Sequence, residues 1–172
     1  MNIPQFDDEE LRLYAEFMLD QLRKTDGFWF LGVENAFSYD AAIKANEEVW
    51  HTMGRITARD IRRSFSIKEK GLQGLYRFFR YFPWAMISGY EIDYKDNEIV
   101  VSVPHCPSQE ARLKKGLGEY GCKRMHFLFF QSIIQELDRG LKVECLFAPP
   151  DPHSSDVFCK WRFTMDQEGS SG

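Results

Sequence analysis

The chain has 172 residues, of which 44% are hydrophobic and 28% charged, a balance typical of a globular domain. Its net charge of −4 and the lack of a basic stripe argue against nucleic-acid binding. No apolar run approaches the ~20 residues that a membrane-spanning helix needs. The segment from Met1 to Asp8 lacks the basic and apolar regions of a secretion signal. We therefore expect a cytoplasmic protein whose partners include no nucleic acid and no membrane.

Four helices are predicted in the first half, where apolar residues recur every three or four positions. They cover residues 8–24, 28–37, 38–63 and 67–81. Asp7 and Glu10 have the spacing of a capping box at the first N-terminus. Asp26-Gly27 is expected to separate the first two helices, and Pro83 to end the last one.

In the second half the apolar residues alternate along two pairs of segments, which predicts strands. Two β-hairpins are expected over 88–104 and 141–165, with helices over 107–115 and 122–137 between them. A loop at Asp96-Asn97 would leave one face of the first hairpin wholly apolar. A second loop centred on Asp151-Pro152 would place Cys145 opposite Cys159.

These elements predict an α+β fold in which a helical N-terminal half packs on a four-stranded antiparallel sheet. The helical region would cover residues 1–85, and a ββααββ core would cover 86–166 as part of the same compact unit. A disordered tail is expected over 167–172.

All four cysteines lie in the second half, beside element boundaries or on apolar strand faces. They are Cys106, Cys122, Cys145 and Cys159. Because a cytosolic chain keeps its thiols reduced, the cysteines favour metal binding over disulfides. Two sulfurs from a hairpin and two from helix N-termini could share one tetrahedral zinc ion, which is our expectation. The alternatives are an iron–sulfur cluster and a set of buried free thiols without a cofactor.

A different arrangement of the same site leaves Cys106 outside the metal shell. Glu144, a histidine or water would then complete the shell, and an open coordination position is what catalytic zinc sites have. In that case the general base of a hydrolase would be Glu34, Glu144 or His153. The sequence leaves both arrangements open.

Aromatic residues make up 15% of the chain. Core packing explains most of them, and an aromatic-lined cavity is the sharper interpretation. The candidates for lining such a cavity are Trp29, Phe30, Trp50, Tyr90 and Trp161, with Glu34 as a polar anchor. The expected partner is a small hydrophobic or aromatic molecule.

The segment from Cys122 to Phe163 resembles the vinyl-reductase-type ligand-binding domain. The resemblance lies in a cysteine that begins a helix, a strand with Cys145, and Cys159-Lys160-Trp161-Arg162-Phe163 in the last strand. It implies zinc held by Cys122, Cys145 and Cys159 beside a pocket for a small aromatic molecule. The loop from Pro149 to Asp156 departs from the short Gly-Asp turn of that family.

The whole chain is similar to a group of uncharacterised prokaryotic cytosolic proteins that resemble aminothiazoline-carboxylate hydrolases. The shared features are a helix like Trp29 to Glu34, Cys106-Pro107 followed by Arg112, and a proline-rich segment before Cys159. Two functions follow. The first is a small-molecule binding or sensing protein with a structural zinc beside an aromatic pocket. The alternative is a metal-dependent hydrolase of a small amide or heterocyclic carboxylate. We also consider a homodimer, since the edges of a short sheet often pair.

Overall fold

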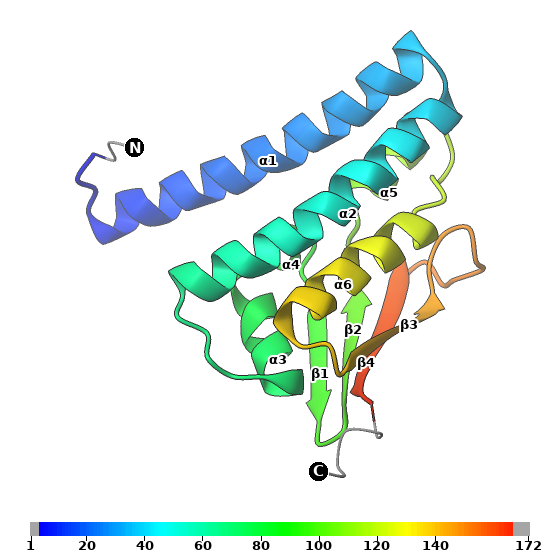
Figure 1. Cartoon of the computed structure of the whole chain (residues 1–172). Helices are drawn as coiled ribbons and strands as arrows, with labels where there is room; N and C mark the ends of the chain where they lie inside the picture. Colours follow the sequence, from blue (N-terminus) through cyan, green and yellow to red (C-terminus); the bar gives the residue numbers. More distant parts are fainter. Residues whose placement is uncertain (1–3, 167–172) are drawn as a thin grey trace.

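The computed structural model describes residues 4–166 and confirms the predicted α+β class. The helices are α1 (Asp8–Ala36), α2 (Tyr39–Ser64), α3 (Gly71–Tyr81), α4 (Pro83–Ile87), α5 (Pro107–Lys114) and α6 (Lys123–Leu137). The strands are β1 (Glu91–Lys95), β2 (Glu98–Val103), β3 (Leu141–Phe147) and β4 (Cys159–Met165). Figure 1 shows the sheet covered by α6, then α2, with α1 outermost. The tail predicted over 167–172 lies outside the described residues.

The four strands form one antiparallel sheet in the order β1-β2-β4-β3. The first hairpin has the expected register, with Tyr94 opposite Ile99. The predicted register of the second hairpin is wrong, because Cys145 lies opposite Trp161 and not opposite Cys159. The reason is a local turn after β3, in which the Asp151 side chain accepts a hydrogen bond from the Ala148 amide. This turn shifts the centre of the loop away from Asp151-Pro152.

Helix α1 is continuous, so the predicted break at Asp26-Gly27 is wrong. One glycine costs a helix about 1 kcal/mol, which packing of this segment against α2 offsets. The capping box is confirmed, since Asp7 and Glu10 exchange side-chain to backbone hydrogen bonds. No residue described in α1 is fully buried.

The helix predicted over 67–81 begins later, at Gly71. Gly71 has a φ of +57°, which a glycine adopts without the strain that a side chain would bring, and its amide donates to the Asp138 carboxylate. Pro83 ends α3 as expected and also begins the short α4. Ile67, in the preceding loop, is buried against the core.

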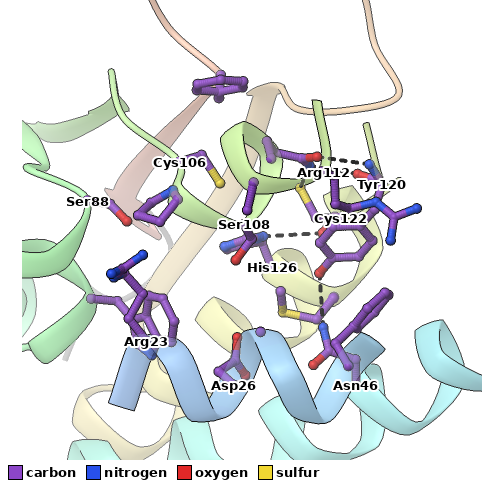
Figure 2. Close-up of a pocket in the computed structure, with 18 of the residues that line it drawn as sticks. Arg23, Asp26, Asn46, Ser88, Cys106, Ser108, Arg112, Tyr120, Cys122 and His126 are labelled. Carbon is purple, nitrogen blue, oxygen red and sulfur yellow. Dashed lines mark hydrogen bonds between the residues drawn. The ribbon is translucent and has the colours of Figure 1, made fainter. Parts of the chain in front are cut away.

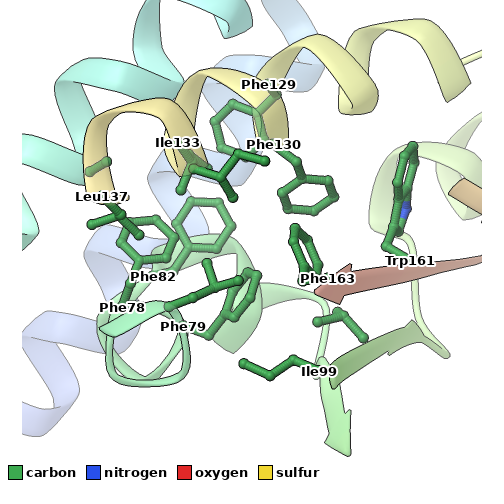
Figure 3. Close-up of a cluster of buried hydrophobic side chains, with 14 of the residues drawn as sticks. Phe78, Phe79, Phe82, Ile99, Phe129, Phe130, Ile133, Leu137, Trp161 and Phe163 are labelled. Carbon is green, nitrogen blue, oxygen red and sulfur yellow. The ribbon is translucent and has the colours of Figure 1, made fainter. Parts of the chain in front are cut away.

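A cluster of buried aromatic residues packs in the core between α3, α6 and the sheet (Figure 3). The ring of Phe130 stands perpendicular to Phe163 at 5.3 Å and also contacts Trp161 at 5.3 Å, both on β4. Phe78, Phe79 and Phe82 reach the same cluster from the α3 side. Edge-to-face contacts of this kind add to the free energy gained by burying the rings.

The two central helices, α2 and α6, approach each other closely at Gly54. A Cβ added at Gly54 would collide with the Ser132 hydroxyl and stand 2.7 Å from the Phe129 carbonyl oxygen. Since that carbonyl belongs to the α6 backbone, it cannot move aside as a flexible side chain could. The absence of a side chain at Gly54 therefore sets the spacing between α2 and α6.

We predict that Gly54→Ala destabilises the protein by about 1–3 kcal/mol, because the added methyl group overpacks the α2–α6 contact. Urea unfolding monitored by circular dichroism measures the change. The control is Gly32→Ala in α1, where an added Cβ meets nothing within 4 Å. Its expected effect is a gain of about 0.5–1 kcal/mol from helix propensity. A Gly54→Ala protein at least as stable as the wild type would contradict the close approach.

Candidate functional site

A cavity of about 340 Å³ lies where α1, α2, α5, α6 and the loop before β4 meet (Figure 2). Its wall is mostly apolar, and its large side chains include Phe30, Trp50, Phe82, Trp84, Met125 and Phe129. The indole of Trp50 stands edge-on to Trp84 at 5.5 Å and to Phe129 at 5.4 Å. These mutual contacts hold the aromatic wall in place without a ligand.

Gln109 fixes the floor of the cavity by joining α5 to the start of α6. It is fully buried, and its side-chain amide donates to the Tyr120 carbonyl at 2.7 Å and accepts from the Tyr120 amide at 2.8 Å. The same nitrogen lies 3.4 Å from the Cys122 sulfur. The Tyr120 hydroxyl in turn accepts a hydrogen bond from Asn46 on α2. No sequence signal marks Gln109 as buried, because α5 is a polar helix and its flanking residues are Ser108 and Glu110.

Three of the four cysteines line the cavity, namely Cys106, Cys122 and Cys159. Burial is the main cause that raises the pKa of Cys106 to about 11 and that of Cys159 to about 12. Burial likewise raises the pKa of Cys122, and the neighbouring Cys106 adds to the shift. The three thiols are therefore protonated at neutral pH and contribute soft, uncharged surface to the wall.

The cysteines as placed do not form the expected zinc centre. Within residues 4–166 no group of three or more His, Cys, Asp or Glu side chains could hold a metal ion. The register of the second hairpin accounts for part of this, because Cys145 lies opposite Trp161 and does not line the cavity. Zinc binding by Cys106, Cys122, Cys145 and Cys159 stays a prediction, and no step below depends on it.

Phe30, Trp50 and Tyr90, all pocket candidates from the sequence, do line the cavity. Trp29 lies on the outer face of α1 with 67% of its surface exposed. Trp161 is fully buried in the core, where its ring packs against Phe130. Both lie outside the set of residues that line the cavity.

Glu34, the expected polar anchor, forms an ion pair beside the cavity. Its carboxylate accepts two hydrogen bonds from the Arg112 guanidinium, at 2.6 and 3.3 Å. Arg112 also donates to the Gly118 carbonyl and lies against the rings of Phe30 and Tyr39. The pair ties α1 to α5, so it closes one side of the cavity and leaves the carboxylate engaged.

The other candidate bases of a hydrolase also have ionic partners. Glu144 is exposed on β3 and accepts from Arg162 at 3.1 Å. His153 lies 3.1 Å from the Glu119 carboxylate, in the loop between β3 and β4. Neither residue lines the cavity.

Asp26 and His126 are ionisable groups in the cavity that the sequence analysis did not flag. Burial raises the pKa of Asp26 to about 6, and a hydrogen bond from Trp50 opposes this. Burial lowers the pKa of His126 to about 4, so this imidazole is neutral at physiological pH. Asp26 was taken for a helix breaker, and His126 stands on the apolar α6, so neither pattern pointed to a cavity.

Comparisons with known proteins give a family and a fold. A model described as a family of unknown function (DUF6125) matches residues 7–165. No curated protein matches the chain. Among solved structures, the chain is similar to a trafficking protein particle complex subunit 3 from Naegleria fowleri, which was crystallised covalently bound to palmitic acid. The TM-score is 0.54 at 11% identity over 88% of this chain and 97% of that one, which shows a common fold alone.

These matches name neither the vinyl-reductase-type domain nor the aminothiazoline-carboxylate hydrolases. Both resemblances stay predictions. Within the described part of the chain, no helix is long and apolar enough to cross a membrane.

Asp26 gives a test of the cavity's low polarity. Its pKa rises from 3.8 in the unfolded chain to about 6 in the fold, so both states are protonated below pH 3.8 and folding then carries no penalty. The penalty grows as the pH rises through this window and is complete above pH 6. We predict that Asp26→Asn is more stable than the wild type at pH 8, by about 1–3 kcal/mol. The difference should shrink towards zero at pH 4.

Urea unfolding of both proteins at pH 4, 5, 6 and 8 measures this difference directly. Asparagine keeps the size of the side chain and an oxygen that can accept from Trp50. A stability difference that does not vary between pH 4 and pH 8 would show that Asp26 is not desolvated.

Proposed function

The chain belongs to the DUF6125 family, and we propose that it is a small-molecule-binding protein whose cavity holds one hydrophobic or aromatic molecule. The observation that carries the proposal is the cavity of about 340 Å³ with its mostly apolar wall. Binding sites for small molecules have volumes of roughly 300–1,000 Å³ and are lined by apolar and aromatic side chains with a few polar groups.

The energetics favour an occupant of this kind. Each Å² of apolar ligand surface removed from water stabilises a complex by about 25 cal/mol. Because Trp50, Trp84 and Phe129 already hold one another in place, a ligand would meet a wall that needs little further ordering. An empty apolar cavity, by contrast, lowers the stability of a fold.

The fold neighbour adds support by analogy. That protein carries palmitic acid covalently, so at least one chain of this fold accommodates an apolar molecule. The proposal for the present chain is made for its own cavity, and the analogy assigns no residue. In the cytoplasm, where we place the protein, the four free cysteines would stay reduced.

Zinc stays a separate prediction, and elemental analysis of protein purified without added metal decides it. About one zinc per chain in the wild type, and none in Cys106→Ala, would support the four-cysteine site. No metal in either protein would leave thiols alone. The hydrolase alternative also stays a prediction, and no observation in residues 4–166 favours it.

The outer helix α1 has an exposed apolar surface that a partner protein could cover. Its N-terminal half exposes large apolar side chains, namely Leu11, Leu13, Tyr14, Phe17 and Met18. Its first turn is acidic, whereas the last turn of α2 carries Arg62 and Arg63. We propose that a second copy covers this helix, because the exposed apolar side chains would then leave water and the acidic and basic turns offer complementary charges for the contact.

We predict that Leu13→Glu with Phe17→Glu converts a dimer into a monomer, because the charges would be buried at the interface. Light scattering after size-exclusion chromatography measures the mass. The control is Phe37→Glu, a more exposed position directly after the C-terminal end of α1. A wild-type protein that is monomeric at 100 μM would contradict this part of the proposal.

The cavity itself is tested by filling it. Gly27 lines the cavity, and an added Cβ there meets nothing within 4 Å. We predict that the wild type binds toluene with a stoichiometry of one and that Gly27→Leu lowers the affinity at least tenfold, because the leucine occupies the ligand's space. Isothermal titration calorimetry measures both values.

The matched control for this test is Gly32→Leu. Gly32 is in the same helix and has the same open surroundings, but it does not line the cavity. Both substitutions raise the helix propensity of α1. A loss of toluene affinity in Gly27→Leu but not in Gly32→Leu therefore reports on the cavity. Equal toluene affinity in the two variants would place the binding site elsewhere.

A further inference from the structure

His126 presents a hydrogen-bond acceptor to the cavity. Its Nδ1 lies 3.3 Å from the Cys122 carbonyl oxygen, and because a carbonyl can only accept, the proton is on Nδ1. The ring is held between Phe130 and Trp161, at centroid distances of 6.0 and 6.2 Å. Its other nitrogen, Nε2, has no hydrogen-bond partner among the described residues. A neutral imidazole in this tautomer offers Nε2 as a fixed lone pair.

Three hydroxyl groups line the same cavity without partners in the described part of the chain, those of Ser88, Tyr90 and Ser108. Ser88 is buried, with 5% of its surface exposed, and Figure 2 shows it among the residues that surround the cavity. Burial raises the pKa of Tyr90 well above its usual value, so its hydroxyl keeps its proton. Each hydroxyl can donate or accept, and therefore suits a ligand group that does both.

The charges around the cavity disfavour an anionic ligand. Arg23 and Lys24 share the single carboxylate of Asp20, and the positive charge left over lies on these partly exposed side chains in contact with water, whereas Arg112 pairs with Glu34. The Asp26 carboxyl lines the cavity and has no cationic partner among residues 4–166. The remaining cation of the lining, Lys115, is an exposed residue and keeps its charge in water. A carboxylate deep in the cavity would lose its hydration and meet the charge of Asp26, while the unpaired positive charge of the lining stays on exposed side chains.

From these groups we infer the class of ligand: the cavity selects an uncharged apolar molecule that carries a hydroxyl group, and it rejects the carboxylate of the same skeleton. The hydroxyl donates to His126 Nε2 and accepts from the hydroxyl of Tyr90 or Ser88. This inference rests on the proposed binding function. It goes further because it names the polar group that the cavity recognises and the charge that it refuses.

The test uses one ring with four substituents: toluene, benzyl alcohol, benzyl methyl ether and benzoate, titrated into the full chain at pH 7.5 by calorimetry. Benzyl alcohol should bind about tenfold more tightly than toluene, because its hydroxyl satisfies groups that toluene leaves unpaired. Benzyl methyl ether, which keeps the oxygen but lacks the donor, should lose that advantage. Benzoate should bind at least tenfold more weakly than benzyl alcohol.

Variants of His126 test whether its Nε2 accepts the hydrogen bond from the ligand's hydroxyl group. In His126→Phe the ratio of the benzyl alcohol affinity to the toluene affinity should fall to about one, whereas His126→Gln should keep part of the preference through its side-chain oxygen. Because the readout is the ratio of two affinities in one protein, a general loss of stability does not change it.

The outcomes separate the two claims. If toluene and benzyl alcohol bind equally, or benzoate binds as well as the alcohol, the ligand class is overturned and the binding function stands. A preference for benzyl alcohol that survives in His126→Phe overturns the role of His126. Binding of none of the four compounds overturns the proposed function itself.

Discussion

Burial of α6 on two sides is the constraint on which the rest of the structure depends. One side of the helix packs on the sheet through Phe130 and Ile133, and the adjoining side meets α2 at Phe129 and Ser132. A helix covered in this way cannot shift towards either layer without opening a gap or overpacking the other, because protein interiors are close-packed. The glycine at position 54 of α2 allows the short distance on the α2 side.

The cavity lies where the close packing around α6 ends. The C-terminal part of α6 is enclosed by α2, α3 and the sheet, whereas its first turns, with Cys122, Met125 and His126, face the cavity. Other elements form the surrounding wall, and the Glu34–Arg112 pair and the Gln109 hydrogen bonds hold α1 and α5 in that wall. The same helix thus supplies the centre of the core and one wall of the site. A ligand in the cavity would extend the apolar core beyond the N-terminal end of α6.

Patterns that report burial of one side of an element were read correctly from the sequence. The alternation in 90–103 and the helical spacing in 122–137 led to the correct elements, because every second residue of β2 is buried and α6 buries the residues at helical spacing. The break expected at Asp26-Gly27 failed because packing on α2 outweighs the local cost of glycine. The register of the second hairpin failed because the Asp151 carboxylate, held by Lys123 and the Ala148 amide, sets the turn. The contact between Lys123 and Asp151 joins residues that are far apart in the sequence.

The candidate site was likewise predicted only in part from the sequence. Phe30, Trp50 and Tyr90 were proposed as cavity residues because large apolar rings favour such positions. Asp26 and His126 were not, because their roles depend on which neighbours surround them in space. No spacing rule reports that a histidine has one nitrogen engaged and the other free.

The most direct test of the central claim is to locate a bound ligand by nuclear magnetic resonance. With methyl-labelled methionine and benzyl alcohol as the probe, the account predicts intermolecular nuclear Overhauser effects to Met125, which is 7% exposed and lines the cavity. Met18, Met53 and Met86 are exposed elsewhere and serve as internal controls. Contacts to those methyl groups, or none to Met125 at saturating ligand, would contradict the account.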